Sequence, residues 1–292
     1  MTPTPCEPDA THRPDAPSRL VLYHANCTDG LVAAWAARRA FGESAEYLPV
    51  RYGDPAPEEA ARGRDVLLVD FSYPRAELFQ LAAAARSLQV LDHHKSAAAE
   101  LEGLAFCTFD LGRSGARLAW DHLHPGVEVP WIVLWSEDRD LWRWRLPDSR
   151  AVNAWLGASM RTLDDVDRVV MEGFDHARIA GGACLVAMEH YLDTAVADAQ
   201  LAHIAGYVVP VVNATRRHVS ELLERLAIGQ SFAAAWHVRG DGSVQYSLRA
   251  ADEEGAVDVS MVAACFGGGG NKRAAGFEVP SLADIVHWAV GR

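Results

Sequence analysis

Three consecutive residues, Asp92, His93 and His94, place a carboxylate and two imidazoles directly after the apolar run 88–91. Such donors at the carboxyl end of a strand can hold Mn²⁺, Mg²⁺ or Zn²⁺ beside a phosphate, because these ions accept oxygen and nitrogen ligands. The tripeptide alone also fits a polar strand end with a capping aspartate. It indicates a metal site only together with other acidic residues.

Further acidic and histidine residues follow other apolar runs in the same part of the chain. His24 and Asp29 come after the apolar residues 20–22, and Asp70 ends the buried-type run 65–69. The carboxyl ends of parallel strands meet at one edge of a sheet, so these side chains are expected to reach one metal cluster. Asp70 is the expected bridging carboxylate.

Taken in chain order, these residues resemble the motifs of the DHH phosphoesterase superfamily. That superfamily includes RecJ-type exonucleases, oligoribonucleases that also act on phosphorylated adenosine nucleotides, and family II pyrophosphatases. The matching residues are His24, Asp29, Asp70, Asp92, His93, His94 and Asp138. Residues 265–277 resemble the glycine-rich substrate-binding motif of the associated DHHA1 domain, usually Gly-Gly-Gly-His-x-x-Ala-Ala-Gly. The motifs together extend over nearly the whole chain.

The resemblance implies a centre of two divalent metal ions, Mn²⁺ by preference, with Mg²⁺ or Zn²⁺ as alternatives. The implied ligands are His24 and Asp70 for one ion, and Asp29, Asp70, His93 and Asp138 for the other. Asp92 would accept an imidazole N–H and so orient that ring, and His94 would face the scissile phosphate. Asp70, Asp92 and His94 are therefore the expected catalytic residues.

The late ligand has two candidates, Asp138 and Asp140, after the run 131–135, whose spacing fits either a helix or a buried strand. Asp138 is preferred, because Asp140 directly precedes Leu-Trp and more readily caps a helix or pairs with Arg143.

Two positions depart from the family pattern. Cys27 stands two residues before Asp29, where the family commonly has a carboxylate. A thiolate is a softer donor, so the first metal site is expected to be weaker, to favour Zn²⁺ over Mn²⁺, or to be completed by water or Asn26. Asn271 replaces the usual histidine of the glycine-rich motif, which removes a titratable group but keeps hydrogen-bonding capacity.

Substrate binding is assigned to residues outside the metal cluster. Ser114 precedes an apolar helical run and can cap a helix whose N–H groups point towards the cluster. Glycines let the backbone approach a phosphate closely, and basic side chains supply local positive charge. The expected substrate-binding residues are Ser114, Arg249, Gly268, Gly269, Gly270, Asn271 and Lys272.

The net charge of −12 disfavours long duplex nucleic acid as a partner, since duplex binding needs many Lys and Arg on phosphates. No apolar run approaches the roughly 20 residues that cross a bilayer, and no hydrophobic signal core is present, so a cytoplasmic location without membrane contact is expected. The five cysteines lack a Cys-x-x-Cys pair, which favours reduced thiols. A homodimer is left open.

The expected fold class is α/β with two domains, because 292 residues exceed the usual size of one core. We predict a disordered tail over residues 1–18, a parallel-sheet metal-binding domain over 19–150, a helical connector over 151–204, and a smaller α/β domain over 205–292. The elements expected in the last domain are a strand at 206–213, a helix at 218–227, a hairpin of 232–238 with 244–248, a helix at 257–266, a strand at 275–279 and a helix at 282–290.

The function that follows is a metal-dependent phosphoesterase acting on short single-stranded oligonucleotides or small phosphorylated nucleotides. A pyrophosphatase or exopolyphosphatase is the enzymatic alternative, since the same metals hydrolyse phosphoanhydrides. A nucleotide-binding sensor with weakened catalysis is the alternative from another class, because of the changes at Cys27 and Asn271.

Overall fold

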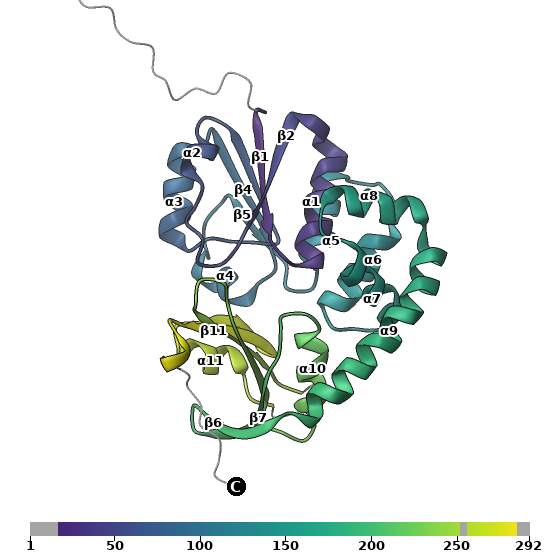
Figure 1. The fold of residues 1–292 in the computed structure, drawn as a ribbon. Coiled ribbons are helices and arrows are strands. Elements are labelled where there is room, and N and C mark those ends of the chain that lie inside the picture. Colours follow the sequence, from purple (N-terminus) through teal and green to yellow (C-terminus); the bar gives the residue numbers. More distant parts are fainter. Residues whose placement is uncertain (1–16, 252–255, 285–292) are drawn as a thin grey trace, which may run out of the picture.

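The computed structural model describes residues 17–251 and 256–284 as an α/β protein with two sheets (Figure 1). Residues 1–16 of the expected tail and residues 285–290 of the expected last helix lie outside this described part. Within it, no helix is both long and apolar enough to cross a membrane.

The first sheet has five parallel strands in the order β2-β1-β3-β4-β5. They are β1 (Arg19–His24), β2 (Ala45–Val50), β3 (Asp65–Val69), β4 (Ser87–Asp92) and β5 (Cys107–Phe109). The three strands expected from the apolar runs are β1, β3 and β4, and they are adjacent in the sheet. Because all five strands run in one direction, their carboxyl ends lie at one edge.

Both faces of this sheet are covered, so the strands are apolar on both sides. Val21 and Leu67 point to the core shared with α1 (Thr28–Phe41), α5 (Gly115–Leu123) and α6 (Trp131–Asp140). Leu22 and Leu68, one residue further along, point to the opposite core with α3 (Arg75–Ala84). The short helices α2 (Glu58–Ala61) and α4 (Lys95–Glu100) and the 3-10 turn Gly42–Ser44 complete this half.

Three helices form the connector: α7 (Ser149–Ser159), α8 (Leu163–Glu172) and the long α9 (Phe174–Ala197). The prediction of helix is wrong for its last residues, because Gln200–Ile204 form strand β6. Ala202 and Ile204 are buried while His203 between them is exposed. This period of two suits a strand that pairs with the next segment of the chain.

The second sheet has the order β10-β11-β9-β8-β7-β6 and is antiparallel except between β7 and β8. Its other strands are β7 (Tyr207–Asn213), β8 (Ala233–Val238), β9 (Val244–Arg249), β10 (Gly269–Asn271) and β11 (Ala274–Val279). Helices α10 (Val219–Leu226) and α11 (Val259–Ala264) and the 3-10 turn Leu282–Asp284 accompany it. The predicted hairpin is β8–β9, and the strand predicted after the glycine-rich motif is β11.

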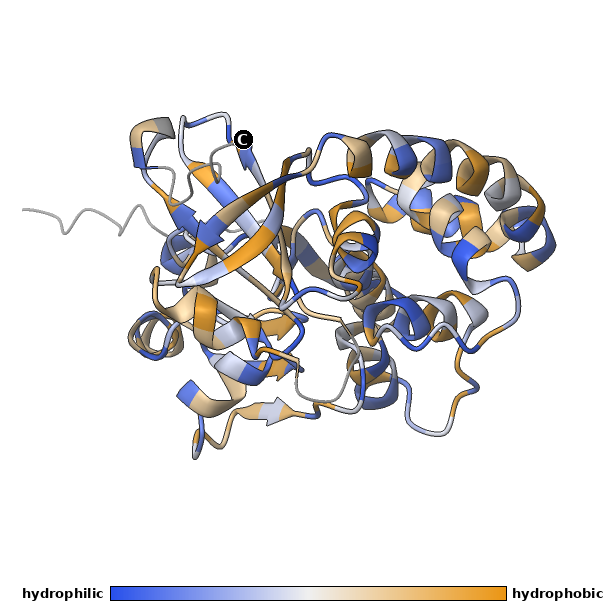
Figure 2. Ribbon diagram, turned by 90° about the horizontal axis from the view of Figure 1, so that it is seen from below, coloured by the Kyte–Doolittle hydropathy of each residue, from blue (hydrophilic) through white to orange (hydrophobic). Residues whose placement is uncertain are grey.

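The carboxyl edge of the first sheet faces the second sheet, with α4 between them (Figure 1). The Arg139 guanidinium, on α6, lies 2.9 Å from the Glu221 carboxylate on α10. The backbone N–H of Lys95, at the start of α4, donates to the Asn271 side-chain oxygen at 3.1 Å. Seen from below, hydrophobic and hydrophilic residues alternate along the elements of both halves (Figure 2), as expected where each element has a buried and an exposed side.

Candidate metal centre

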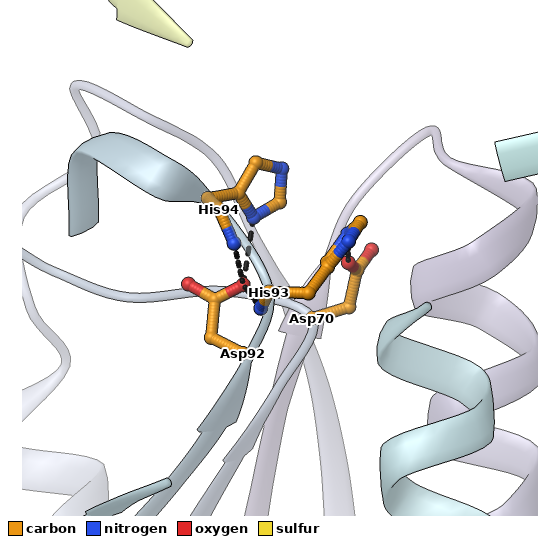
Figure 3. A group of neighbouring side chains, drawn as sticks. All are labelled: Asp70, Asp92, His93 and His94. Carbon is orange, nitrogen blue, oxygen red and sulfur yellow. Dashed lines mark hydrogen bonds and ion pairs between the residues drawn. The ribbon is translucent and has the colours of Figure 1, made fainter. Parts of the chain in front are cut away.

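Histidine and aspartate side chains from three neighbouring strands meet at the carboxyl edge of the first sheet. His24 ends β1, Asp70 directly follows β3, and Asp92 ends β4 ahead of His93 and His94 (Figure 3). Potential ligand atoms within 4.8 Å of one another form three groups. The groups are Asp70, Asp92, His93 and His94; His24, Cys27 and Asp70; and Asp29, His93 and Asp140.

Asp70 belongs to two of the three groups and is 1% exposed. Its Oδ1 lies 3.1 Å from His93 Nε2, and its Oδ2 lies 3.5 Å from His24 Nδ1. In the described part of the chain, neither oxygen has a hydrogen-bond donor in suitable geometry, and buried His24 Nδ1 also has no partner. Buried polar atoms normally have partners, so these three atoms fit a cation between them.

The electrostatics of the cluster also fit a bound cation. Burial by itself lowers the pKa of His93, but the contact with Asp70 and the charges of Asp140, Asp70 and Asp29 raise it to about 11. Burial and the neighbouring carboxylates Asp140 and Asp70 raise the pKa of Asp29 well above its usual value. An excess of buried negative charge favours bound protons or metal cations. This donor set of carboxylates and imidazoles suits Mn²⁺, Mg²⁺ or Zn²⁺.

Two glycines allow the helices to approach the cluster closely. A Cβ added at Gly30, in the first turn of α1, would lie 2.3 Å from the carbonyl oxygen of His24. A Cβ at Gly115, the first residue of α5, would lie 2.6 Å from Asp70 Oδ1. Both helices therefore begin directly against the ligand residues. The approach also brings the Ala116 N–H of α5 to Asp29 Oδ2, at 3.2 Å.

Asp92 holds the His94 ring in place. Its carboxylate is fully buried, and Oδ1 lies 2.7 Å from His94 Nδ1 while Ser72 Oγ donates to Oδ2 at 2.6 Å. Oδ1 also accepts the backbone N–H of His93 at 2.7 Å. Because a carboxylate accepts hydrogen bonds, it favours a proton on His94 Nδ1, which leaves Nε2 as the atom that is free to meet a ligand.

The late aspartate is placed differently from the expectation. Asp138 accepts the backbone N–H groups of Arg145 at 3.0 Å and Leu146 at 3.3 Å, so its carboxylate holds the loop after α6. Asp140, two residues on, lies 3.5 Å from His93 Nε2 and joins the cluster. Residues two apart on a helix point roughly 200° apart, so only one of the two can face the metal ligands. The geometry favours Asp140.

The glycine-rich motif lies beside α4, which directly follows His94. A Cβ added at Gly268 would lie 2.1 Å from the carbonyl oxygen of Gly276, and Gly270 has φ +142°, so both positions need glycine. The Asn271 side-chain oxygen accepts a hydrogen bond from the backbone N–H of Lys95, the first residue of α4. Gly269 and Asn271 form the short strand β10 rather than an irregular loop, and Lys272 is exposed in the turn after it.

Ser114 caps α5 as expected, because its buried hydroxyl accepts the Arg117 N–H at 3.3 Å. Arg249, at the end of β9, is 9% exposed, and its guanidinium lies 3.7 Å from the ring centre of Trp142. No hydrogen bond or ion pair joins this guanidinium to any residue in 17–251 or 256–284. Burial lowers the pKa of Arg249 to about 10, so it remains a cation at neutral pH.

The sequence reasoning missed Tyr52. It lies in the loop after β2, with its ring centre 5.4 Å from that of His24. Tyr52 belongs to no periodic apolar pattern and to no recognised motif. An aromatic residue beside Arg51 and Gly53 just after a strand was the available signal for Tyr52.

No protein-family model matches this chain. A protein of Acanthamoeba polyphaga mimivirus, described as Uncharacterized protein R106, is 25% identical over 288 aligned residues, which cover 88% of this chain and 66% of the viral protein. This chain thus spans slightly less than two thirds of that relative's length.

Solved structures of similar fold include RecJ with Mn²⁺ from Thermus thermophilus, with 17% identity, TM-score 0.48, and coverage of 89% of this chain and 49% of RecJ. An exopolyphosphatase-related protein from Bacteroides fragilis has 12% identity, TM-score 0.45, and coverage of 91% and 88%. The pGpG-specific phosphodiesterase PggH from Vibrio cholerae has 12% identity, TM-score 0.41, and coverage of 91% and 94%.

Proposed function

We propose that this protein is a metal-dependent phosphoesterase of the DHH type, acting on short single-stranded oligonucleotides or small phosphorylated nucleotides. The observation that carries the proposal is the buried Asp70 carboxylate, which is shared by two ligand groups, faces His24 and His93, and has no hydrogen-bond donor in suitable geometry among the described residues. The motifs at both ends of the chain support the same assignment, because the glycine-rich strand β10 lies next to the helix that follows His94.

Two divalent cations would be held by His24 and Asp70 on one side, and by Asp29, Asp70, His93 and Asp140 on the other. When bound, such ions lower the pKa of water and neutralise charge on a phosphate. Asp70 would provide an oxygen to each site.

The remaining polar residues would bind and orient the substrate. Asp92 fixes the His94 ring, so that Nε2 can donate to a phosphate oxygen when the ring is protonated. Arg249 offers a guanidinium that forms no ion pair with the described residues, and a guanidinium matches the geometry of a phosphate. Trp142 holds this group over its ring face, and a cation–π contact leaves the positive charge in place.

A substrate panel tests the proposal. Purified protein with Mn²⁺, Mg²⁺ or Zn²⁺ is assayed against dinucleotides, 3′-phosphoadenosine 5′-phosphate, cyclic dinucleotides and pyrophosphate. Metal-dependent release of nucleoside monophosphate or phosphate from the nucleotides is expected. Turnover of pyrophosphate alone would replace the proposed activity by a phosphoanhydride hydrolase, and tight nucleotide binding without turnover would indicate a sensor.

Arg249→Ala is expected to raise KM for phosphorylated substrates about tenfold or more, because hydrogen bonds to charged groups contribute roughly 1.5–3 kcal/mol. Metal content should remain that of the wild type, since Arg249 is outside the three ligand groups. Arg39→Ala, which removes an exposed guanidinium at the end of α1, serves as the control. Loss of metal from Arg249→Ala would show that the residue supports the cluster instead.

Cys27→Asp is expected to raise the affinity for Mn²⁺ relative to Zn²⁺, because carboxylates suit harder ions than sulfur does. The Cys27 sulfur lies in one ligand group with His24 and Asp70. Competition between the two metals, followed by metal analysis of wild type, Cys27→Asp and Cys27→Ser, measures the change. An unaltered preference and stoichiometry in all three proteins would remove Cys27 from the ligand set.

A further inference from the structure

Tyr52 lies beside the metal cluster. Its ring centre lies 5.4 Å from that of His24 and 6.1 Å from that of His94, both in edge-on orientation. The buried ring of Phe71 packs against the Tyr52 ring, and the two ring centres are 4.7 Å apart. The ring is therefore held by packing at a fixed place next to the side chain expected to face the scissile phosphate.

Tyr52 is much more exposed than the aromatic residues Phe71 and Tyr73 next to it. Phe71 and Tyr73 are 1% and 3% exposed, whereas Tyr52 is 48% exposed. The exposed part of the Tyr52 ring therefore meets solvent beside the histidines of the metal cluster.

A basic side chain directly precedes Tyr52 in the chain. Arg51 is exposed, and its backbone N–H donates to the Asp54 carboxylate at 3.2 Å. Across residues 17–251 and 256–284, the Arg51 guanidinium forms no ion pair.

We propose that Tyr52 is a stacking platform for a nucleobase, and that its neighbour Arg51 binds a phosphate of the same nucleotide. This inference rests on the proposed function and assigns the residue that recognises the base of its substrate. A half-exposed ring contributes less to folding than a buried one, but it offers a flat face on which any base can stack. An exposed guanidinium without an ion pair among the described residues, in an otherwise acidic protein, provides the charge that a phosphate needs.

Equilibrium binding separates this proposal from catalysis. Adenosine 5′-monophosphate and ribose 5-phosphate share the sugar phosphate and differ in the base. Calorimetry with the wild-type protein should give about tenfold tighter binding of the nucleotide, given the energy of base–aromatic stacking. In Tyr52→Ala the two ligands should bind about equally, whereas Tyr52→Phe should keep the preference. Arg51→Ala should weaken both ligands by a similar factor.

Tyr207→Ala is the matched control, since Tyr207 is 38% exposed on β7 of the second sheet. A nucleotide preference that survives in Tyr52→Ala would overturn the platform, and so would an equal weakening of both ligands by that substitution. A wild-type protein that binds the nucleotide through Tyr52 but turns over no substrate would refute the phosphoesterase and leave the nucleotide subsite standing. Wild-type binding without any preference for the base would refute the subsite alone.

Discussion

Asp70→Asn is expected to lower kcat by about 10³-fold or more, well beyond the roughly 10–100-fold typical of residues that merely support metal ligands. A neutral amide cannot offset the charge of two dications, and both carboxylate oxygens of Asp70 are placed towards imidazoles of different ligand groups. Metal analysis should show fewer than two ions per chain. Steady-state kinetics and metal content of the same preparation measure the effect.

The fold should tolerate this substitution. Asp70 has φ +56°, a left-handed conformation that asparagine adopts more readily than most residues. Asp148→Asn is the matched control, because Asp148 has φ +54° and is exposed away from the ligand groups. Unfolding curves of both variants should resemble the wild type, and only Asp70→Asn should lose activity. Normal turnover by Asp70→Asn would reject a bridging role for this carboxylate.

The strand-borne part of the cluster could be predicted because β1, β3 and β4 each have a short apolar run that ends in a polar residue. Parallel pairing then places the residues after those runs at one edge, which brings together His24, Asp70 and His93. That step needs only the direction of the strands and the period of two. The same logic predicted the hairpin β8–β9, where Gly240 and Gly242 lie between two apolar runs.

Other parts of the fold and the site could not be predicted, because they depend on contacts between segments that are distant in the sequence. The run 131–135 fits a helix or a strand equally well, so the direction of each side chain after it could not be derived from spacing. Residues 200–204 follow a long helix in the sequence, and only their pairing with β7 makes them a strand. Tyr52 stands in a loop without periodicity, and its position depends on packing against Phe71, which follows another strand.

Asp140→Asn is expected to lower activity and metal binding, whereas Asp138→Asn is expected to lower stability, although the residues are two apart on α6. Asp140→Asn should lower kcat by about 100-fold and weaken one metal site, because its carboxylate lies beside His93 in a ligand group with Asp29. Asp138→Asn should lower the free energy of unfolding by about 1–3 kcal/mol, the usual cost of leaving a buried partner unsatisfied. Its metal content should stay that of the wild type.

The destabilisation by Asp138→Asn has a specific origin in the loop after α6. Trp142 and Trp144 have φ +55° and +51°, which is unfavourable for large side chains, and the Asp138 carboxylate accepts two N–H groups just beyond them. Urea unfolding and metal analysis of the two variants, each serving as the other's control, separate support of the loop from ligation. Loss of metal from Asp138→Asn together with full metal occupancy in Asp140→Asn would show that Asp138 is the ligand. The hydrogen bonds from the loop to the Asp138 carboxylate would then have to break when metal binds.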